Sequence, residues 1–446
     1  MSVKIDFHKQ IGTLNPDLHS SNFATIVSSR RIFDSHDLFK SMHFTAARTH
    51  DWALVNSGQR MVDVHNIFPL MHLDADDERN YVWGPTDEAI RLCYDAGTKI
   101  MYRLGTSIEH TGNEIHFNTI PPQDFDKYAD VCAHIIRHYT RGWSNGFHYD
   151  IKGWEIWNEP ELHVCMWQGS DELFAKFFAT VLKRLKTEFP DQIIGGPAHC
   201  CLEETLLPGI KAECDKLGVE PDFYSFHRYG RELDDILSLP GKARRCLDAL
   251  GWKNTKISIN EWHFLRTWEG LHKNVNQEKF KRAIEGADGV IGINSAAFNI
   301  CTICGWHDTP LDEAYYYGCG DGYWGFRTLF KGLNKNYYSM VLLGNLFSRF
   351  SRRVAVEGCT ATQRALAAIS DDGKEGALLI GDFCGPDMSI NIELEASCPN
   401  AKITSCLALD NIRDNQECDC SFDENGVLHL AKSEPGSAAF WVTFSL

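Results

Sequence analysis

Two glutamates of this sequence stand in nearly the same local context. Glu159 lies in "GWEIWNEPEL" (153–162), and Glu261 lies in "KISINEWHFL" (256–265). Each follows an asparagine and sits next to a tryptophan or a proline, at the end of a strand-like run. Pro160 cannot continue a strand interior, so the first strand is predicted to end at the asparagine–glutamate pair. A carboxylate held there among aromatic side chains could transfer a proton or attack an electrophilic carbon.

Other polar and aromatic residues also stand where strand-like runs end. When parallel strands close into a barrel, their carboxyl ends face one mouth, where active sites lie. Residues from separate strands would then meet, and the two glutamates would converge on an aromatic cleft. The alternative for each glutamate is a hydrogen-bonded structural corner. The other residues are Arg48, His50, Asp51, Arg103, Trp157, Asn158, His227, Tyr229, Trp262, His263, Trp306, His307 and Asp308.

The segments that carry these residues alternate between strand-like and helix-like patterns. Apolar residues at helical spacing mark the helices, and β-branched or aromatic runs mark the strands. Such alternation predicts parallel strands with crossover helices, and seven or eight units fit a (β/α)8 TIM barrel, which we place at residues 15–347. The predicted strands are 40–51, 98–107, 149–160, 192–199, 221–230, 255–265 and 295–306, and the predicted helices are 83–97, 121–142, 170–190, 204–218, 233–251 and 276–293.

The pattern changes after about residue 348. Short strand-like runs are broken there by "DDGKEG" and "GPD", which favour turns. This predicts a C-terminal antiparallel β domain, sandwich-like, at residues 348–446. The opening residues 1–14 are also strand-like and are predicted to join the sheet of that domain. The expected fold class is therefore α/β, a barrel followed by a β domain.

Composition limits the partners. The chain has 446 residues and a formal net charge of −16, which argues against nucleic acid and anionic membranes as partners. The opening "MSVKIDFHKQIG" lacks the apolar core of a signal peptide, and no apolar run reaches 18 residues. We therefore expect a cytoplasmic location, with the 16 cysteines as reduced thiols. The sequence leaves a homo-oligomer open.

No metal site or other cofactor is expected. "CTIC" (301–304) has the spacing of one half of a zinc site, but Cys418 and Cys420 are too close together to supply a good second half. The 19 histidines include no HExxH motif. A metal-dependent hydrolase is therefore a weaker alternative.

Two carboxylates that converge on an aromatic cleft favour glycoside hydrolysis. One carboxylic acid, which needs a raised pKa, protonates the departing glycosidic oxygen. The other, which must stay ionised, attacks the anomeric carbon to form a glycosyl-enzyme that water then hydrolyses. A non-catalytic carbohydrate-binding protein could use the same aromatic cleft, but it would not need both glutamates.

The sequence also resembles a known family. "WEIWNEPEL" resembles the acid/base motif of clan A glycoside hydrolases, which are retaining (β/α)8 enzymes, and "KISINEWHFL" resembles their nucleophile strand. "IGTLNPDLHSSNF" (11–23), "ARTHD" (47–51), "DFYSFHRYG" (222–230) and "KGLNKNYYSMVLLGNL" (331–346) resemble glycoside hydrolase family 39. That family contains β-xylosidases, α-L-iduronidases and other exo-acting enzymes. The resemblance extends over nearly the whole chain.

The resemblance implies roles for individual residues. Glu159 would be the acid/base and Glu261 the nucleophile. Asn158 would donate to the sugar 2-hydroxyl, and His227 and Tyr229 match the pair beside the nucleophile. His227 could instead be a core histidine. The full set of expected substrate-binding residues is Asn158, His50, Arg48, His227, Tyr229, Trp306, His307 and Trp324, although the tryptophans and His307 could equally be packing residues and Arg48 and His50 could simply orient other side chains.

The substrate implied by the resemblance is the terminal sugar of a plant-type oligosaccharide or glycoside. A β-xyloside is the first expectation. The alternatives are an α-L-arabinofuranoside, because family 51 shares much of this pattern, another exo-glycosidase substrate, or an α-L-uronide. A uronide would favour arginine at the mouth, from Arg48, Arg103 or Arg228. By strand parity, Arg228 is predicted to point away from the face that carries His227 and Tyr229.

Overall fold

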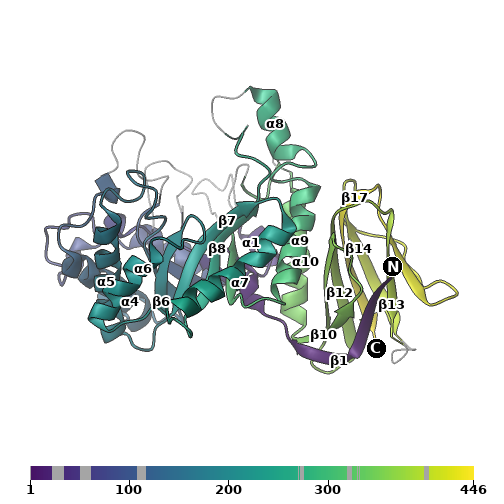
Figure 1. The fold of residues 1–446 in the computed structure, drawn as a ribbon, viewed down its shortest axis with the longest axis horizontal. Coiled ribbons are helices and arrows are strands. Elements are labelled where there is room, and N and C mark those ends of the chain that lie inside the picture. Colours follow the sequence, from purple (N-terminus) through teal and green to yellow (C-terminus); the bar gives the residue numbers. More distant parts are fainter. Residues whose placement is uncertain are drawn as a thin grey trace.

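The structure contains a barrel and a second sheet, which lie side by side (Figure 1). It is a computed structural model. It describes residues 2–22, 35–50, 62–107, 117–269, 271, 276–318, 324–328, 330, 332–395 and 401–446. Of the residues predicted above for the barrel mouth, Asp51 lies outside this part of the chain.

Eight parallel strands form the closed barrel, in the order β2-β3-β4-β5-β6-β7-β8-β9. The first and last strands pair in parallel, Ser20 with Tyr315 and Ser21 with Tyr316, and this pairing closes the ring. The predicted (β/α)8 barrel is therefore confirmed. The strands are β2 Ser20–Ser21, β3 Ala46–Arg48, β4 Lys99–Leu104, β5 Gly153–Ile156, β6 Ile194–His199, β7 Phe223–Gly230, β8 Lys256–Phe264 and β9 Glu313–Tyr316.

Helices cover the outside of the barrel, and α4 shows how the sequence specifies them. The Asp124 side chain caps the first turn by accepting from the Lys127 amide, and Gly142, at φ 72°, ends the helix in the left-handed conformation. The helices are α1 His36–Ser41, α2 Val64–Ile67, α3 Gly84–Asp95, α4 Phe125–Arg141, α5 Asp171–Glu188, α6 Leu207–Leu217, α7 Leu233–Ala249, α8 Gln277–Glu285, α9 Ile293–Trp306 and α10 Lys335–Arg349.

The predicted strand at 295–306 is wrong, because this segment belongs to helix α9. Helix α9 lies between the barrel and the second sheet (Figure 1), and nearly all of its side chains are buried. A helix buried on all sides has no polar face, so its sequence reads as a continuous apolar run, as a buried strand does. The strand that closes the barrel is β9, a few residues further along the chain.

The second sheet has nine strands in the order β15-β14-β17-β12-β11-β10-β1-β13-β16. Strand β1 pairs antiparallel with β10 and parallel with β13, so both ends of the chain lie in this sheet (Figure 1). The division of the chain at residue 348 stays a prediction. The strands are β1 Ser2–Thr13, β10 Arg352–Glu357, β11 Gln363–Ile369, β12 Glu375–Gly385, β13 Ser389–Leu394, β14 Lys402–Leu409, β15 Asp414–Glu417, β16 Val427–Ala431 and β17 Gly436–Ser445.

The central strands of this sheet are buried on both faces. Leu379 and Trp441 belong to the core that the sheet shares with the barrel and its helices, whereas Ile380 and Phe440 belong to the core on the opposite face. Neighbouring residues of a strand point to opposite faces, so one apolar run supplies both cores. In the described part of the chain, no helix has the length and apolar character needed to cross a membrane.

Candidate active site

The backbone after β5 turns sharply and presents Glu159. Trp157 and Glu159 both have positive φ angles, 72° and 44°, a conformation that non-glycine residues adopt only where the surroundings hold them. The Trp157 indole N–H donates to the Met166 carbonyl at 3.0 Å. The Glu159 amide donates to the Ala198 carbonyl, at the end of β6, at 2.9 Å. Packing and hydrogen bonds thus fix the direction of the Glu159 side chain.

His227 links the two glutamates. Its Nδ1 lies 3.0 Å from Glu159 Oε1, and its Nε2 lies 3.5 Å from Glu261 Oε2. One oxygen of each carboxylate and a ring nitrogen of His227 all lie within 4.8 Å of one another. Retaining glycosidases hold their carboxyl groups about 5–5.5 Å apart, and inverting enzymes about 6.5–9.5 Å apart. The 4.8 Å limit applies to the nearest oxygens, and it places the two carboxylates close enough to act on one substrate.

Glu261 is surrounded by donors. The Tyr229 hydroxyl donates to Glu261 Oε1. Arg48 Nη1 lies 3.4 Å from Glu261 Oε2, and His50 Nε2 lies 3.7 Å from the same oxygen. Strands β3, β7 and β8 therefore all contribute to the surroundings of this carboxylate. The Glu261 side chain is only 7% exposed.

Burial is the main cause that raises the pKa of Glu261 to about 7. The neighbouring Glu159 carboxylate acts in the same direction, because a second negative charge disfavours ionisation. His227, Arg48 and the Tyr229 hydrogen bond act in the opposite direction and lower the pKa. These opposing effects leave the pKa of Glu261 raised, so its charge is sensitive to the groups around it.

Arg48 lies beneath the two carboxylates and faces protein groups. Its Nε donates to Glu155 Oε2 at 2.6 Å, and its Nη2 donates to Asn158 Oδ1 at 2.7 Å. Its Nη1 donates to Asn22 Oδ1 at 2.8 Å. The sequence predicted that Arg48 binds substrate, but the side chain is completely buried in these contacts. This geometry favours a role in positioning Asn158 and Glu261.

Glu155 is a site residue that sequence reasoning missed. Besides Arg48, its carboxylate accepts from the Ser225 hydroxyl at 2.7 Å and from the Asn260 amide. Glu155 is fully buried at the centre of the barrel. A signal was present, because Glu155 is a charged residue inside an apolar strand-like run, where a buried carboxylate needs polar partners.

A third carboxylate lies close to the acid/base candidate. Glu161 Oε1 accepts from the Cys200 amide at 2.6 Å. Burial raises the pKa of Glu161 to about 7, and the charge of Glu159 contributes to that increase. Three carboxyl groups thus lie near one another, and together they favour retention of a proton on this side of the site.

A cleft of about 500 Å3 opens over the two glutamates. Its aromatic wall is continuous: the ring of Tyr229 lies 5.4 Å from Trp268 and 5.7 Å from Trp324, and Trp324 lies 5.7 Å from Tyr317. Trp268 is 52% exposed and stands at the rim. Such faces can pack against the apolar faces of a sugar ring. The lining residues are Glu159, Leu162, Cys200, Arg228, Tyr229, Glu261, Trp268, Tyr317 and Trp324.

Arg228 lines this cleft although strand parity predicted that it points away. His227 and Tyr229, on either side of it, both contact Glu261, so the alternation of side chains is kept at these three residues. Its guanidinium forms an ion pair with Asp235 in α7. Arg228 is therefore a paired cation at the edge of the cleft.

The structure does not bring Trp306 and His307 to the glutamates. Both were predicted at the carboxyl end of a barrel strand, but they stand at the end of helix α9. Trp306 donates to the Ile236 carbonyl at 3.2 Å, and His307 accepts from the Asn15 amide at 3.1 Å. Asn15 also bonds to Asp312, just before β9 begins, so His307 lies at the opposite end of the barrel.

The other predicted substrate-binding residues do gather around Glu159 and Glu261. They are Asn158, His50, Arg48, His227, Tyr229 and Trp324.

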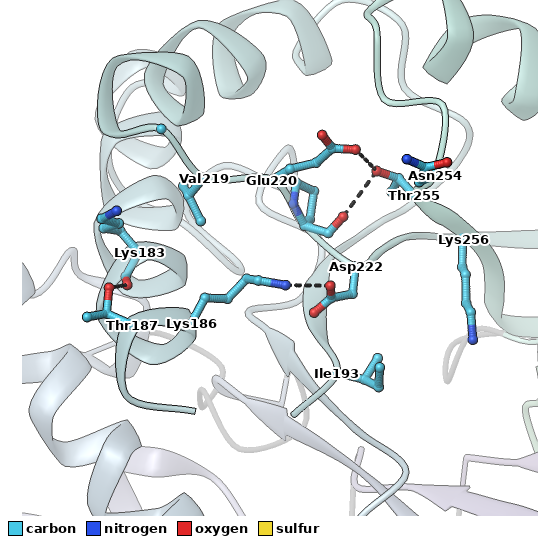
Figure 2. Close-up of a pocket in the computed structure, with 12 residues that line it drawn as sticks. Lys183, Lys186, Thr187, Ile193, Val219, Glu220, Asp222, Asn254, Thr255 and Lys256 are labelled. Carbon is cyan, nitrogen blue, oxygen red and sulfur yellow. Dashed lines mark hydrogen bonds and ion pairs between the residues drawn. The ribbon is translucent and has the colours of Figure 1, made fainter. Parts of the chain in front are cut away.

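A larger cavity, of about 600 Å3, lies away from this site (Figure 2). It is found where β6, β7 and β8 begin, which is the end of the barrel opposite to the glutamates. Lys186 pairs with Asp222 there, and the Thr255 hydroxyl donates to Glu220 at 3.0 Å. None of the predicted site residues lines it. Because it lies at the end of the barrel opposite to the carboxyl ends of the strands, the larger cavity is a weaker candidate for catalysis.

Glu159, His227 and Glu261 also satisfy the spacing of metal ligands. Protein contacts already explain their positions, because His227 lies between the carboxylates and Tyr229 donates to Glu261. A hydrogen-bonded carboxylate pair is therefore the simpler description.

Fold and site together define a class of protein: a (β/α)8 barrel with two facing carboxylates at the carboxyl ends of its strands, under an aromatic cleft. Residues 36–238 match the model of glycosyl hydrolases family 39. The matched segment is slightly less than half of the 446-residue chain, and the match indicates a glycoside hydrolase similar to that family. The matched residues include Glu159, and Glu261 lies beyond them.

Individual proteins are similar to this chain in sequence or in fold. A β-xylosidase from Caldicellulosiruptor saccharolyticus is 28% identical over 118 residues, which are 26% of this chain and 23% of that protein. The alignment thus spans less than a quarter of that relative. A glucosidase from Croceicoccus marinus has a similar fold, with a TM-score of 0.80 at 17% identity over 100% of this chain and 99% of that chain. A GH39 β-xylosidase from Caulobacter crescentus gives a TM-score of 0.68 at 13% identity, over 100% of both chains.

Proposed function

We propose that this protein is a retaining, exo-acting glycoside hydrolase. The observation that carries the proposal is the approach of the two carboxylates: one oxygen of each lies within 4.8 Å of the other and of a ring nitrogen of His227. That approach leaves little room for the water that an inverting enzyme holds between its carboxylates. The similarity to glycosyl hydrolases family 39 supports the same chemistry.

In the first step, Glu261 forms a bond to the anomeric carbon while the glycosidic bond breaks and Glu159 gives its proton to the leaving oxygen. In the second step, Glu159 takes a proton from water, and that water replaces Glu261 at the anomeric carbon. Asn158 Nδ2 lies 3.4 Å from Glu159 Oε2, so its amide is close to the bond that breaks. From there it could donate to a sugar hydroxyl.

The charges around the cleft favour a neutral sugar. Arg48 is paired with Glu155, and Arg103 is buried with Asp63. Arg228 is paired with Asp235, so each of these three arginines already has a protein counterion. A uronide would have to compete for one of them and approach three carboxylates. We therefore propose a β-xyloside as substrate and keep an α-L-arabinofuranoside as the second candidate.

A panel of nitrophenyl xylosides, arabinofuranosides, glucosides, galactosides and uronides, measured with and without chelator, tests this function. We expect chelator-independent turnover of a neutral glycoside and, by NMR, a first product with the configuration of the substrate. Sugar binding without turnover would support a carbohydrate-binding protein instead. Loss of turnover on chelation would support a metal-dependent hydrolase.

A further inference from the structure

Three cysteines, Cys406, Cys418 and Cys420, gather at one edge of the second sheet. Cys406 lies in β14, and Cys418 follows directly after β15. The register pairs Leu407 with Glu417 and Ala408 with Gln416, which places Cys406 and Cys418 opposite each other on neighbouring antiparallel strands. The Cys418 amide donates to the Cys406 carbonyl at 3.0 Å.

The two sulfur atoms are close to each other. Cys406 Sγ lies 3.3 Å from Cys418 Sγ. Directly opposed residues that exchange backbone hydrogen bonds have Cα atoms about 5.5 Å apart, which is inside the range that a disulfide spans. A covalent bond between them would therefore need rotation of side chains but little movement of the backbone. Cys420, two residues further on, also interacts with the Cys406 thiol.

Access and reactivity differ among these thiols. Cys406 is only 4% exposed, whereas Cys418 and Cys420 are partly exposed. A hydrogen bond from Cys406 lowers the pKa of the Cys418 thiol, burial opposes this, and the Arg413 guanidinium adds to the lowering. The carboxylates of Asp410 and Asp419 act in the opposite direction. Because thiolate is the attacking form, Cys418 can react first, and buried Cys406 can then resolve the product.

We propose that Cys406 and Cys418 form a redox-active dithiol site that small disulfides of the glutathione class oxidise to a protein disulfide. The Cys418 thiolate attacks one sulfur of the small disulfide, forms a mixed disulfide and releases one thiolate. Cys406 loses its proton and attacks the Cys418 sulfur, so the protein disulfide forms and a second thiolate leaves. The protein loses two electrons and two protons, and the small disulfide is reduced to two thiols.

The Cys406–Cys418 disulfide would link an edge strand covalently to its neighbour. β15 is the outermost strand on its side of the sheet, and it is held to helix α10 by Lys335–Asp414 at 2.6 Å and by Asn415–Tyr338 at 2.9 Å. A disulfide from β14 to the end of β15 would limit fraying of this edge. The expected effect is on stability and does not depend on the proposed glycosidase activity.

The test uses the full-length reduced protein in glutathione buffers of increasing oxidised fraction, quenched with N-ethylmaleimide and mapped by mass spectrometry. We expect a Cys406–Cys418 linked peptide that forms at least tenfold faster than modification of Cys246, a thiol of comparable partial exposure in α7. The oxidised protein should melt several degrees higher than the reduced protein. Cys418→Ser should abolish the link and the shift, while Cys420→Ser should retain both.

Cys406→Ser should arrest the reaction as a stable mixed disulfide on Cys418, because the resolving thiol is gone. Cys406→Ala gives the same readout should the buried serine disturb folding. Three results would overturn the proposal: a stable mixed disulfide on Cys418 in the wild type, oxidation no faster than that of Cys246, or a stoichiometric soft metal that protects the three thiols in the purified protein.

Discussion

Glu261, the proposed nucleophile, lies where ionisation is costly. A nucleophile must be ionised, yet the side chain is buried beside a second carboxylate, and its pKa is raised to about 7. The ring of His227, the Arg48 guanidinium and the Tyr229 hydrogen bond lower the pKa, but they offset only part of the increase. Substrate binding or the departure of a proton to Glu159 must then complete the ionised state, so pH should be a sensitive probe of this pair.

We expect kcat/KM to fall as the pH decreases below about 7, because Glu261 then takes up a proton. Glu159→Gln removes the neighbouring charge that raises this pKa, so the acidic limb should move to lower pH. A dinitrophenyl glycoside is the suitable substrate, since its leaving group needs no acid. An acidic limb that stays in place, or moves to higher pH, would contradict the assigned coupling.

Glu159→Ala should affect substrates according to their leaving groups. A sugar is a poor leaving group and needs the proton from Glu159, whereas a nitrophenolate does not. The loss of turnover should therefore be much larger for natural oligosaccharides than for nitrophenyl glycosides. Azide should restore part of the rate and appear in a glycosyl azide product. Equal losses on both substrates, with no azide adduct, would argue against Glu159 as acid/base.

Glu261→Gln should lower turnover by several orders of magnitude and stabilise the fold at alkaline pH. The carboxyl has a pKa of about 7 when folded and an ordinary value of 4.5. Between pH 4.5 and pH 7 the folded state therefore binds more protons than the unfolded state. The stability that the protonated Glu261 contributes is fully present below pH 4.5, and it is lost as the pH rises through 7. The loss is on the order of 3 kcal/mol. Denaturation at pH 8 and pH 4.5 should show a gain for the variant only at pH 8. A gain of equal size at both values would exclude ionisation as its cause.

At the scale of elements, the barrel strands position the two catalytic candidates. Arg48 in β3, Glu155 in β5, Ser225 in β7 and Asn260 in β8 form one buried network under the two catalytic candidates. Each of these side chains is buried and forms a hydrogen bond to at least one residue from another strand. The positions of Asn158 and Glu261 therefore depend on the register of these four strands.

Glu155→Gln tests that network. Arg48 would lose its charged partner at 2.6 Å and could shift away from Asn158 and Glu261. Displacements of about 1 Å at a reacting centre cost about 100-fold in rate. We expect a loss of that order in kcat with little change in KM. Glu313→Gln is the matched control, because Glu313 is another buried barrel glutamate, bonded to Tyr315 at the start of β9. A similar loss in both variants would indicate a general effect on folding.

The same elements show what the sequence could and could not predict. The asparagine–glutamate pairs were predictable because both stand at the ends of apolar strands, and parallel strands must end at one mouth. The link from Arg48 to Glu155 depends on strand register, which a single sequence does not contain. Helix α9 was mistaken for a strand because both of its sides are buried, and Trp306 and His307 were misplaced with it. Trp268 and Tyr317 lie just after β8 and β9, where no periodic pattern marks a side chain as facing the cleft.

For the whole molecule, helix α9 joins the barrel to the second sheet. Its side chains contact β12 on one side and the barrel strand β8 on the other. Phe298 packs on Phe264 of β8 at 5.3 Å and on Phe383 of β12 at 5.5 Å. Because one buried helix serves both cores, we expect the barrel and the sheet to unfold together, in a single transition.

Gly381→Val should weaken both parts at once. Gly381 in β12 presses directly on α9: a Cβ atom there would lie 2.8 Å from Cys301 Sγ and 3.1 Å from Ile300 Cγ2. Overpacking of this kind costs about 1–3 kcal/mol. Urea unfolding followed by circular dichroism and by glycosidase activity should show both signals shifted together to lower denaturant. Gly12→Val in β1 is the control, since a Cβ atom at Gly12 meets nothing within 4 Å. If the Gly381 variant lost its far-ultraviolet signal in two separate steps, with activity surviving the first, the sheet and the barrel would be independent units and α9 would not couple them.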